Sequence, residues 1–138
     1  MPRVSVIMPS YNYARYIGAS LESVLAQTFT DFEVLVVDDD SRDGSREVVR
    51  SYLGDPRVCL IEQSRNQGIA LTQNAGISLS SGEFICILNA DDIWRAEKLA
   101  RQVAFLDDNP EISSVFNMPE LIDGEGVRIG ENDERRTT

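Results

Sequence analysis

Two clusters of aspartates follow short apolar runs of this sequence. Asp91 and Asp92 come shortly after the run at residues 84–88, and three aspartates at positions 38–40 come after the run at residues 32–37. Carboxylate oxygens are the ligands that Mg²⁺ and Mn²⁺ prefer, so the pair Asp91–Asp92 could hold a divalent cation. Acidic residues at such places can equally be solvated turn residues or caps of the following helix, and one cluster alone does not decide between these interpretations.

Histidine is absent from the sequence. Its absence excludes imidazole zinc sites, Ser-His-Asp triads, Cys-His pairs and a histidine general base within this chain. Carboxylates must therefore carry out any acid–base or metal chemistry. Cys59 and Cys86 each lie in an apolar, strand-like run and share no ligand spacing, so we expect reduced core residues of a cytoplasmic protein.

The chain has 138 residues and a formal net charge of −10. That length suits one domain that buries a core without disulfides or metal ions. The negative charge disfavours binding to nucleic acid or to an anionic membrane surface, so a phosphorylated ligand would need a cation. The longest apolar runs have about five residues, far below the ~20 that span a bilayer, so we expect no transmembrane segment.

Apolar runs alternate with segments of helical periodicity along the chain. We expect strands at residues 4–8, 32–37, 57–61, 84–88 and 112–116, and helices at residues 15–27, 43–53, 69–79 and 96–108. In the third helix we expect Leu71, Ala75 and Leu79 to face the core. Glycines at 124 and 126 favour a hairpin between residues 120–123 and 127–129, and we expect a disordered acidic tail after Gly130.

This alternation predicts an α/β fold with a mainly parallel sheet and helices on both faces. Right-handed crossovers favour the strand order 3-2-1-4. Ligands of such sheets bind at the carboxyl ends of the strands, near the point where the strand order reverses. That order brings three polar segments into one crevice, namely residues 9–12, 38–41 and 89–92.

Two common phosphate-binding loops are missing. The sequence has neither G-x-G-x-x-G after the first strand nor G-x-x-x-x-G-K-[ST], which excludes the usual Rossmann dinucleotide site and a P-loop. Residues 39–44 imitate the start of an EF-hand loop, but Arg50 stands where its bidentate glutamate belongs, so we reject calcium there. A phosphorylated ligand would then be held through a divalent cation at Asp91 and Asp92.

Several motifs occur in a fixed order: VSVIMPSYNYARYIGASLESVLAQTFTDFEVLVVDDDSRDGS, then Asn66 and Gly68 in N-x-G, then Asn74-Ala75-Gly76, then LNADDIW with Lys98-Leu99. Over residues 4–116 this order resembles the family 2 glycosyltransferases. The resemblance implies the GT-A fold, a Rossmann-like, three-layer α/β/α fold of nucleotide-diphospho-sugar transferases, truncated here at the C-terminus. It also implies that residues 1–117 bind a nucleotide sugar and that residues 118–138 begin the missing acceptor-binding half.

The resemblance assigns roles to individual residues. The loop after the first strand and Asp39 would hold the nucleoside of a UDP-linked sugar, with the Tyr11 ring offering a stacking face and an ionised Asp39 accepting an N–H of the base. Asp38 would instead cap or brace its loop. The residues implied in nucleotide binding are Pro9, Ser10, Tyr11, Asn12, Asp39, Asn66 and Asp91.

Residues 89–92 match the Asp-x-Asp-type motif of the family. Asp91 would lie towards the ribose and the metal, and Asp92 would bind Mn²⁺ or Mg²⁺. Asn89 stands where many members have Asp, and Gln73 stands where many have Arg. We therefore expect a weakened or altered metal dependence, because Asn can offer a carbonyl oxygen but no charge.

The implied activity is transfer of a sugar, with inversion, to a saccharide, lipid or other acceptor in cell-surface glycan synthesis. The catalytic base is expected beyond Thr138, and the protein is expected in the cytoplasm, also at the inner face of the membrane. Two alternatives stay open at this stage: a non-catalytic nucleotide-sugar-binding or interaction module, and nucleotidyl transfer on a related fold. The acceptor and the oligomeric state are left open by the sequence.

Overall fold

The computed structural model describes residues 1–131; the tail expected to be disordered lies outside the described residues, apart from its first position, 131. The chain divides into two compact units, Met1–Arg101 and Gln102–Thr138. The polar strand ends singled out above all lie in the first unit. The division of binding roles near residue 117 stays a prediction.

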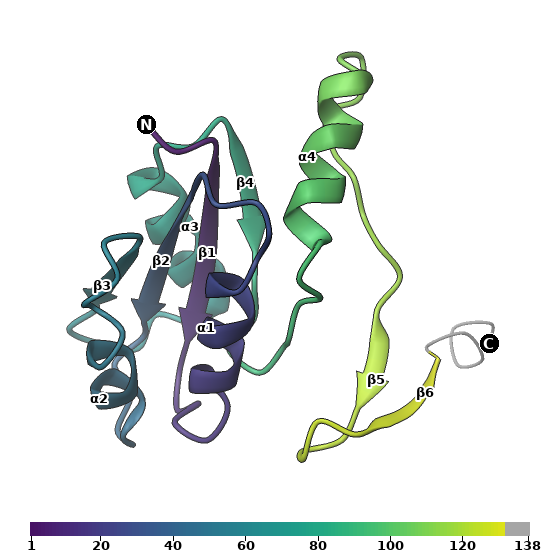
Figure 1. Ribbon diagram of the computed structural model, residues 1–138. Helices are drawn as coiled ribbons and strands as arrows, with labels where there is room; N and C mark the ends of the chain where they lie inside the picture. Colours follow the sequence, from purple (N-terminus) through teal and green to yellow (C-terminus); the bar gives the residue numbers. More distant parts are fainter. Residues whose placement is uncertain (132–138) are drawn as a thin grey trace. The chain divides into compact units, whose positions relative to one another are not determined.

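The first unit is built on a four-stranded parallel sheet (Figure 1). Its strands are β1 (Val4–Ser10), β2 (Phe32–Asp38), β3 (Val58–Glu62) and β4 (Phe84–Ile87), in the order β3-β2-β1-β4. The predicted order is confirmed. Strand β1 pairs with both β2 and β4, so the ends of β2 and β4 flank the end of β1.

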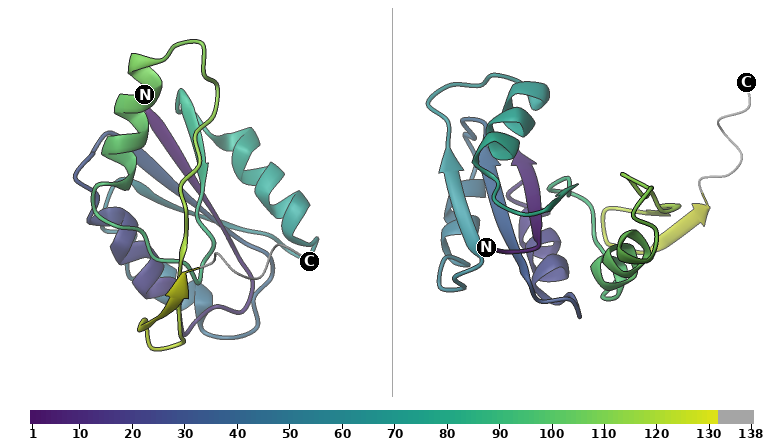
Figure 2. Two further views of the ribbon diagram at one scale, coloured as in Figure 1. Left: turned by 90° about the vertical axis from the view of Figure 1, so that its right-hand side faces the viewer. Right: turned by 90° about the horizontal axis from the view of Figure 1, so that it is seen from above.

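Helices cover both faces of this sheet, which gives the three predicted layers (Figure 2). Helices α1 (Ile17–Leu25) and α2 (Ser45–Arg50) lie on one face, and α3 (Ile69–Leu79) lies on the other. On α1, Ile17, Leu21 and Val24 are fully buried, as their i, i+4, i+7 spacing predicts. Helix α4 (Lys98–Asp108) follows the acidic segment after β4.

The inward face of α3 differs from the prediction. Thr72 and Gly76 are buried, whereas Leu71 and Leu79 are more than half exposed. A Cβ at position 76 would come within 2.5 Å of a methyl group of Ile7, so glycine is what allows α3 to approach the sheet this closely. Periodicity of large apolar residues therefore identified the helix correctly but selected the wrong face.

The apolar run that forms strand β4 is open on one face of the sheet. Ile85 and Ile87 are 48% and 38% exposed. Ile87 pairs with Ile7, whose methyl group lies beneath Gly76, so the open face of β4 is the face that carries α3. Strand β4 ends the described sheet on this side, and α3 packs over β1 and β2 instead.

The cysteines are free, as predicted, but their expected burial is only partly correct. Cys59 is exposed because it lies on β3, the other edge of the sheet. Cys86 is half-buried, and burial raises the pKa of its thiol. Neither residue belongs to the most deeply buried part of the core, which the two central strands form.

The second unit contains a two-stranded antiparallel hairpin, β5 (Glu120–Ile122) with β6 (Arg128–Glu131), which confirms the predicted hairpin. Gly126 has a φ of 80°, the left-handed conformation that glycine adopts without strain. The prediction of a strand at residues 112–116 is wrong, since that segment is irregular. Within residues 1–131 no strand pairs with it, and an apolar run without a partner strand leaves its backbone groups unpaired.

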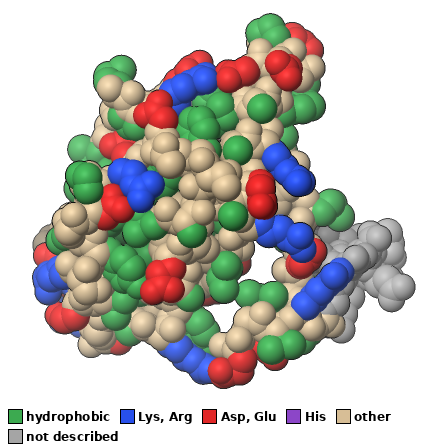
Figure 3. Space-filling model, in the orientation of Figure 1, with side chains coloured by type: hydrophobic (Ala, Val, Ile, Leu, Met, Phe, Trp, Pro, Cys, Tyr) green, Lys and Arg blue, Asp and Glu red, His purple; other side chains and the backbone are tan. Residues whose placement is uncertain are grey.

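Surface charges of both signs are mixed with hydrophobic side chains on the face shown in Figure 3. Among the ion pairs of the described residues, Arg50 is paired with both Glu47 and Glu62. None of the helices in the described part of the chain is long and apolar enough to cross a membrane.

Candidate nucleotide and metal site

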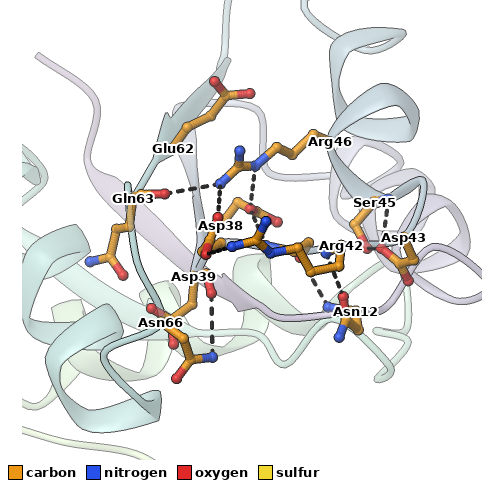
Figure 4. A network of polar contacts seen from close by, with 12 residues as sticks. Asn12, Asp38, Asp39, Arg42, Asp43, Ser45, Arg46, Glu62, Gln63 and Asn66 are labelled. Atoms are coloured by element: carbon orange, nitrogen blue, oxygen red, sulfur yellow. Dashed lines mark hydrogen bonds and ion pairs between the residues drawn. The ribbon is translucent and has the colours of Figure 1, made fainter.

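The loops that follow β1 and β2 are joined by hydrogen bonds at the carboxyl end of the sheet (Figure 4). The Asn12 N–H donates to the Ser41 hydroxyl at 2.9 Å, and the Arg42 N–H donates to the Asn12 side-chain carbonyl at 2.8 Å. Asn12 and Asp40 have φ values of 59° and 64°, a conformation that short polar side chains tolerate best. The Asn12 side chain therefore holds the two loops together, and its expected contact with a nucleotide stays a prediction.

Asp39 is 3% exposed and fixes the start of α3. Its two carboxylate oxygens accept the backbone N–H groups of Gln67 and Gly68, each at 2.8 Å. Gly68 is the N-cap residue of α3 and Gln67 precedes it, so neither N–H has a partner within the helix. A carboxylate accepts about four hydrogen bonds, so Asp39 retains acceptor capacity for a ligand.

Asp38 and Arg46 stabilise the end of β2 by hydrogen bonds (Figure 4). One of its oxygens accepts the Ser41 N–H at 2.9 Å and the Arg46 Nε–H at 2.5 Å, and Arg46 also donates to the Gln63 carbonyl at 2.9 Å. The hydrogen bond to Asp38 raises the pKa of Arg46. The expectation that Asp38 braces its loop is confirmed by these contacts.

Ser10 and Asp38 face each other across β1 and β2. The Ser10 hydroxyl and one oxygen of Asp38 are buried and have no hydrogen-bond partner among residues 1–131. Since the Ser10 side chain is only 2% exposed, it lies beneath the surface of the site. Pro9 is buried as well, whereas Tyr11 is 44% exposed and presents the one aromatic ring of this segment.

Asn66, the remaining residue expected in nucleotide binding, lies beside Asp39. Its side-chain amide approaches the Asp39 backbone carbonyl at 3.4 Å. The residue itself is exposed. The structure thus brings Asn66 and Asp39 together from segments 27 positions apart in the sequence.

Asp91 and Asp92 are exposed in the irregular segment between β4 and α4. The Asn89 side-chain amide donates to the Asp92 carboxylate at 3.0 Å. Among the residues that the structure describes, no three or more histidines, cysteines, aspartates or glutamates form a cluster that could hold a metal ion. Two carboxylates still fit Mg²⁺ or Mn²⁺, because such ions commonly take one or two protein carboxylates and complete their shell with phosphate oxygens and water.

Sequence reasoning missed two groups of residues around the site. Arg46, which ties the ends of β2 and β3 together, was not singled out, nor were Ser20 and Ser23 on α1 and Gln27 just after that helix. Ser20 and Ser23 are spaced i and i+3, on one stripe of the helix, and Gln27 continues that spacing at i+7 beyond the helix end. That polar stripe beside an apolar one was the available signal.

The sequence profile described as Glycosyl transferase family 2 matches residues 5–132. This chain belongs to glycosyl transferase family 2. Among its relatives, an Escherichia coli protein named UDP-Glc:alpha-D-GlcNAc-diphosphoundecaprenol beta-1,3-glucosyltransferase WfgD is 40% identical over 124 residues, covering 90% of this chain and 48% of the relative. Glycosyltransferase GlyG of Streptococcus pneumoniae is 36% identical over 121 residues, covering 85% of this chain and 40% of the relative.

Solved structures of family relatives share the fold. TarS of S. aureus, in complex with UDP-GlcNAc, has a TM-score of 0.75 and 32% identity, covering 78% of this chain and 32% of TarS. The mannosyltransferase PcManGT of Pyrobaculum calidifontis, in complex with GDP-Man and Mn²⁺, has a TM-score of 0.72 and 35% identity, covering 78% of this chain and 33% of its own. The chain spans less than half the length of each of these four relatives.

Proposed function

We propose that this chain is the nucleotide-sugar-binding part of a glycosyltransferase that uses a UDP-linked sugar and a divalent cation. The observation that carries the proposal is the exposed pair Asp91–Asp92, which lies four and five residues after the end of β4, the strand that pairs with β1, whose end carries Tyr11. Membership of glycosyl transferase family 2 supports the same assignment, as do relatives solved with UDP-GlcNAc or with GDP-Man and Mn²⁺.

Asp91 and Asp92 are the proposed metal ligands, and Asn89 orients the Asp92 carboxylate through its amide. Mn²⁺ or Mg²⁺ bound there would offset the charge of the diphosphate and of the departing nucleotide. Asp91 would also contact the ribose. The chain itself contributes the carboxylate pair and the segment that holds it in place.

The nucleoside is proposed to bind at the end of β1. The exposed Tyr11 ring would stack on the base, and Asp39 would accept a base N–H with its remaining acceptor capacity. Since Asp39 is already fixed by two backbone donors, it would meet the base without rearrangement. Pro9, Ser10 and Asn12 would shape this pocket largely through the backbone, and Asn66 would line it beside Asp39.

In the whole protein we propose transfer of the sugar with inversion to a saccharide or lipid acceptor in glycan synthesis, at the inner face of the membrane. The name of WfgD, which includes a diphosphoundecaprenol-linked GlcNAc, supports a lipid-linked acceptor here. The catalytic base is proposed to lie beyond Thr138.

Calorimetric titration of the 138-residue chain with UDP, with and without Mn²⁺, tests the proposal. Asp92→Ala should remove the Mn²⁺-dependent part of UDP binding, while Asp39→Ala should weaken UDP binding and leave its dependence on Mn²⁺. Unchanged affinity in both variants would overturn the assignment. A parallel titration with GDP tests which nucleobase the chain prefers, since tighter binding of GDP than of UDP would contradict the choice of UDP.

A second candidate is a binding module without catalysis. It is favoured by Asn89, which replaces a charged residue at the proposed metal site. Hydrolysis of a UDP-sugar by the chain, measured by release of UDP, would exclude this alternative.

A further inference from the structure

The segment that carries the acidic pair is held along one face of α1. Residues 88–97 form no helix or strand, so their backbone groups need partners elsewhere. Three α1-side residues supply them. The Ser20 hydroxyl donates to the Asp92 carbonyl at 2.6 Å, and the Trp94 N–H donates to the Ser23 hydroxyl at 3.1 Å.

Gln27 extends the same row by one turn and uses both ends of its side-chain amide. Its Nε2 donates to the Arg95 carbonyl at 2.8 Å, and its Oε1 accepts the Leu99 N–H at 3.0 Å. The second contact satisfies an N–H in the first turn of α4, which has no partner within that helix. Just beyond the helix, the Thr28 N–H donates to the Ala96 carbonyl at 2.9 Å.

Burial makes these contacts costly to break. Ser20 is fully buried and Gln27 is 4% exposed, so each would leave a polar group unpaired if its partner moved away. Neighbouring Ile17, Leu21 and Val24 anchor α1 in the core. The helix therefore has two adjoining stripes, an apolar one towards the sheet and a polar one towards the acidic segment.

We infer that Ser20, Ser23 and Gln27 are positioning residues for the metal ligands Asp91 and Asp92, an inference that rests on the function proposed above. The Asp92 side chain is exposed, and it accepts a hydrogen bond from Asn89 of the same segment. Its place relative to the sheet is consequently set through its main chain, by the Ser20 hydroxyl. Without that row of contacts the segment would have to be ordered when metal and nucleotide bind, which weakens binding.

Two measurements on the 138-residue chain test the inference. Hydrogen exchange without ligand follows the amides of Trp94 and Leu99, with a core amide of β1 as reference. Calorimetry then gives the affinity for Mn²⁺ in the presence of UDP and the affinity for UDP without metal. The second value separates a metal-positioning role from general damage to the fold.

The variants differ in which contact they remove. Ser20→Ala removes the donor to the Asp92 carbonyl. Gln27→Met removes the contacts with Arg95 and Leu99 together with a donor to the Ser23 carbonyl, while Gln27→Glu keeps an acceptor for Leu99 but loses the donor to Arg95. Ser23→Thr retains the hydroxyl that Ser23→Ala removes. Ser51→Ala is the matched control, because its hydroxyl also donates to a backbone carbonyl but lies on the exposed end of α2.

We expect Ser20→Ala to weaken Mn²⁺ binding roughly three- to tenfold, the range expected for loss of one hydrogen bond. Gln27→Met removes more than one hydrogen bond and should weaken Mn²⁺ binding at least as much, and both variants should leave UDP affinity without metal nearly unchanged. Ser23→Ala should expose the Trp94 amide to exchange, and Ser23→Thr should restore its protection. Ser51→Ala should change neither measurement.

Faster exchange at Trp94 and Leu99 with unchanged Mn²⁺ affinity would overturn the inference, because the row would then support only the fold. Equal losses of metal-free UDP affinity and Mn²⁺ affinity would overturn it too. If the unaltered chain binds no Mn²⁺ with UDP while its exchange pattern is as described, the proposed function fails and the positioning role fails with it.

Discussion

The Asn89 side-chain amide donates a hydrogen bond to the Asp92 carboxylate, with 3.0 Å between Nδ2 and Oδ2. An aspartate at position 89 could not make this contact, because an ionised carboxylate has no donor. Asn89 therefore holds Asp92 in place where a carboxylate would repel it. Asn89 adds no charge to the proposed metal site, but it orders one of the proposed ligands before a metal arrives.

Replacing Asn89 by Asp should strengthen metal binding. The added charge favours a divalent cation, and we expect about tenfold tighter binding of Mn²⁺ in the presence of UDP, equivalent to roughly 1.4 kcal/mol. Without metal the two carboxylates repel each other, so the variant should be slightly less stable. Asn89→Ala is the control that removes the hydrogen bond without adding charge, and it should bind Mn²⁺ no better than the unaltered chain. Calorimetric titration distinguishes these outcomes.

Removing Arg46 should destabilise the chain strongly. Asp38 is 1% exposed and would be left as an uncompensated buried charge, which typically costs about 3 kcal/mol or more. We expect Arg46→Met to lower the free energy of unfolding in urea by about that amount. Arg50→Met is a matched control on the same helix, because its pairs with Glu47 and Glu62 are half exposed and should contribute less than about 1 kcal/mol. Equal losses in both variants would contradict the importance assigned to Asp38.

Asp55 should make the stability depend on acid pH. Hydrogen bonds from the Arg57 side chain and backbone lower the pKa of Asp55 from an ordinary value of 3.8 to about 2. Because its pKa is lowered in the folded state, ionised Asp55 stabilises the fold above pH 3.8. This contribution to the free energy of unfolding is lost as the pH falls towards 2. We expect a contribution of about 1 kcal/mol after solvent screening, since both side chains are more than a quarter exposed.

Urea unfolding at several pH values between 5 and 2 measures this contribution. Asp55→Asn should be less stable than the unaltered chain at pH 5, and the difference should disappear near pH 2. A difference that stays constant across this range would show that the carboxylate charge of Asp55 is not its source.

Adding a methyl group at position 76 should push α3 away from the sheet. In Gly76→Ala the new Cβ would lie 2.5 Å and 3.1 Å from methyl groups of Ile7 and Val37, and overpacking of this kind typically costs about 1–3 kcal/mol. Gly54→Ala is the matched control, since nothing lies within 4 Å of a Cβ there. Denaturant unfolding of both variants should show a loss only for position 76.

The strand order could be predicted because the signal is repeated along the chain. Each apolar run is followed by a helical period, and the rules for parallel sheets then allow few arrangements. The face of α3 could not be predicted in the same way, because hydrophobicity favoured Leu71 and Leu79 while the close approach to Ile7 required Gly76. The strand at residues 112–116 failed because a run of apolar residues does not reveal whether a partner strand exists.

The candidate site was only partly accessible from the sequence. Aspartates that follow an apolar run can be identified directly from the sequence, and Asp91 and Asp92 were identified in this way. The partners of Asp39 could not be predicted, because they are the backbone N–H groups of Gln67 and Gly68, which any residue type except proline would supply. The serines of α1 were overlooked because polar residues on a helix are ordinarily assigned to the solvent.

The only tryptophan of the sequence, Trp94, lies within the segment that α1 holds. Its fluorescence is therefore an intrinsic optical reporter of the acidic segment, with no label required. Because α1 is packed in the core and also holds the acidic segment, heating should unfold the core and the segment in a single cooperative transition. The melting curve of Trp94 emission should then coincide with the curve that far-ultraviolet circular dichroism records for the helices.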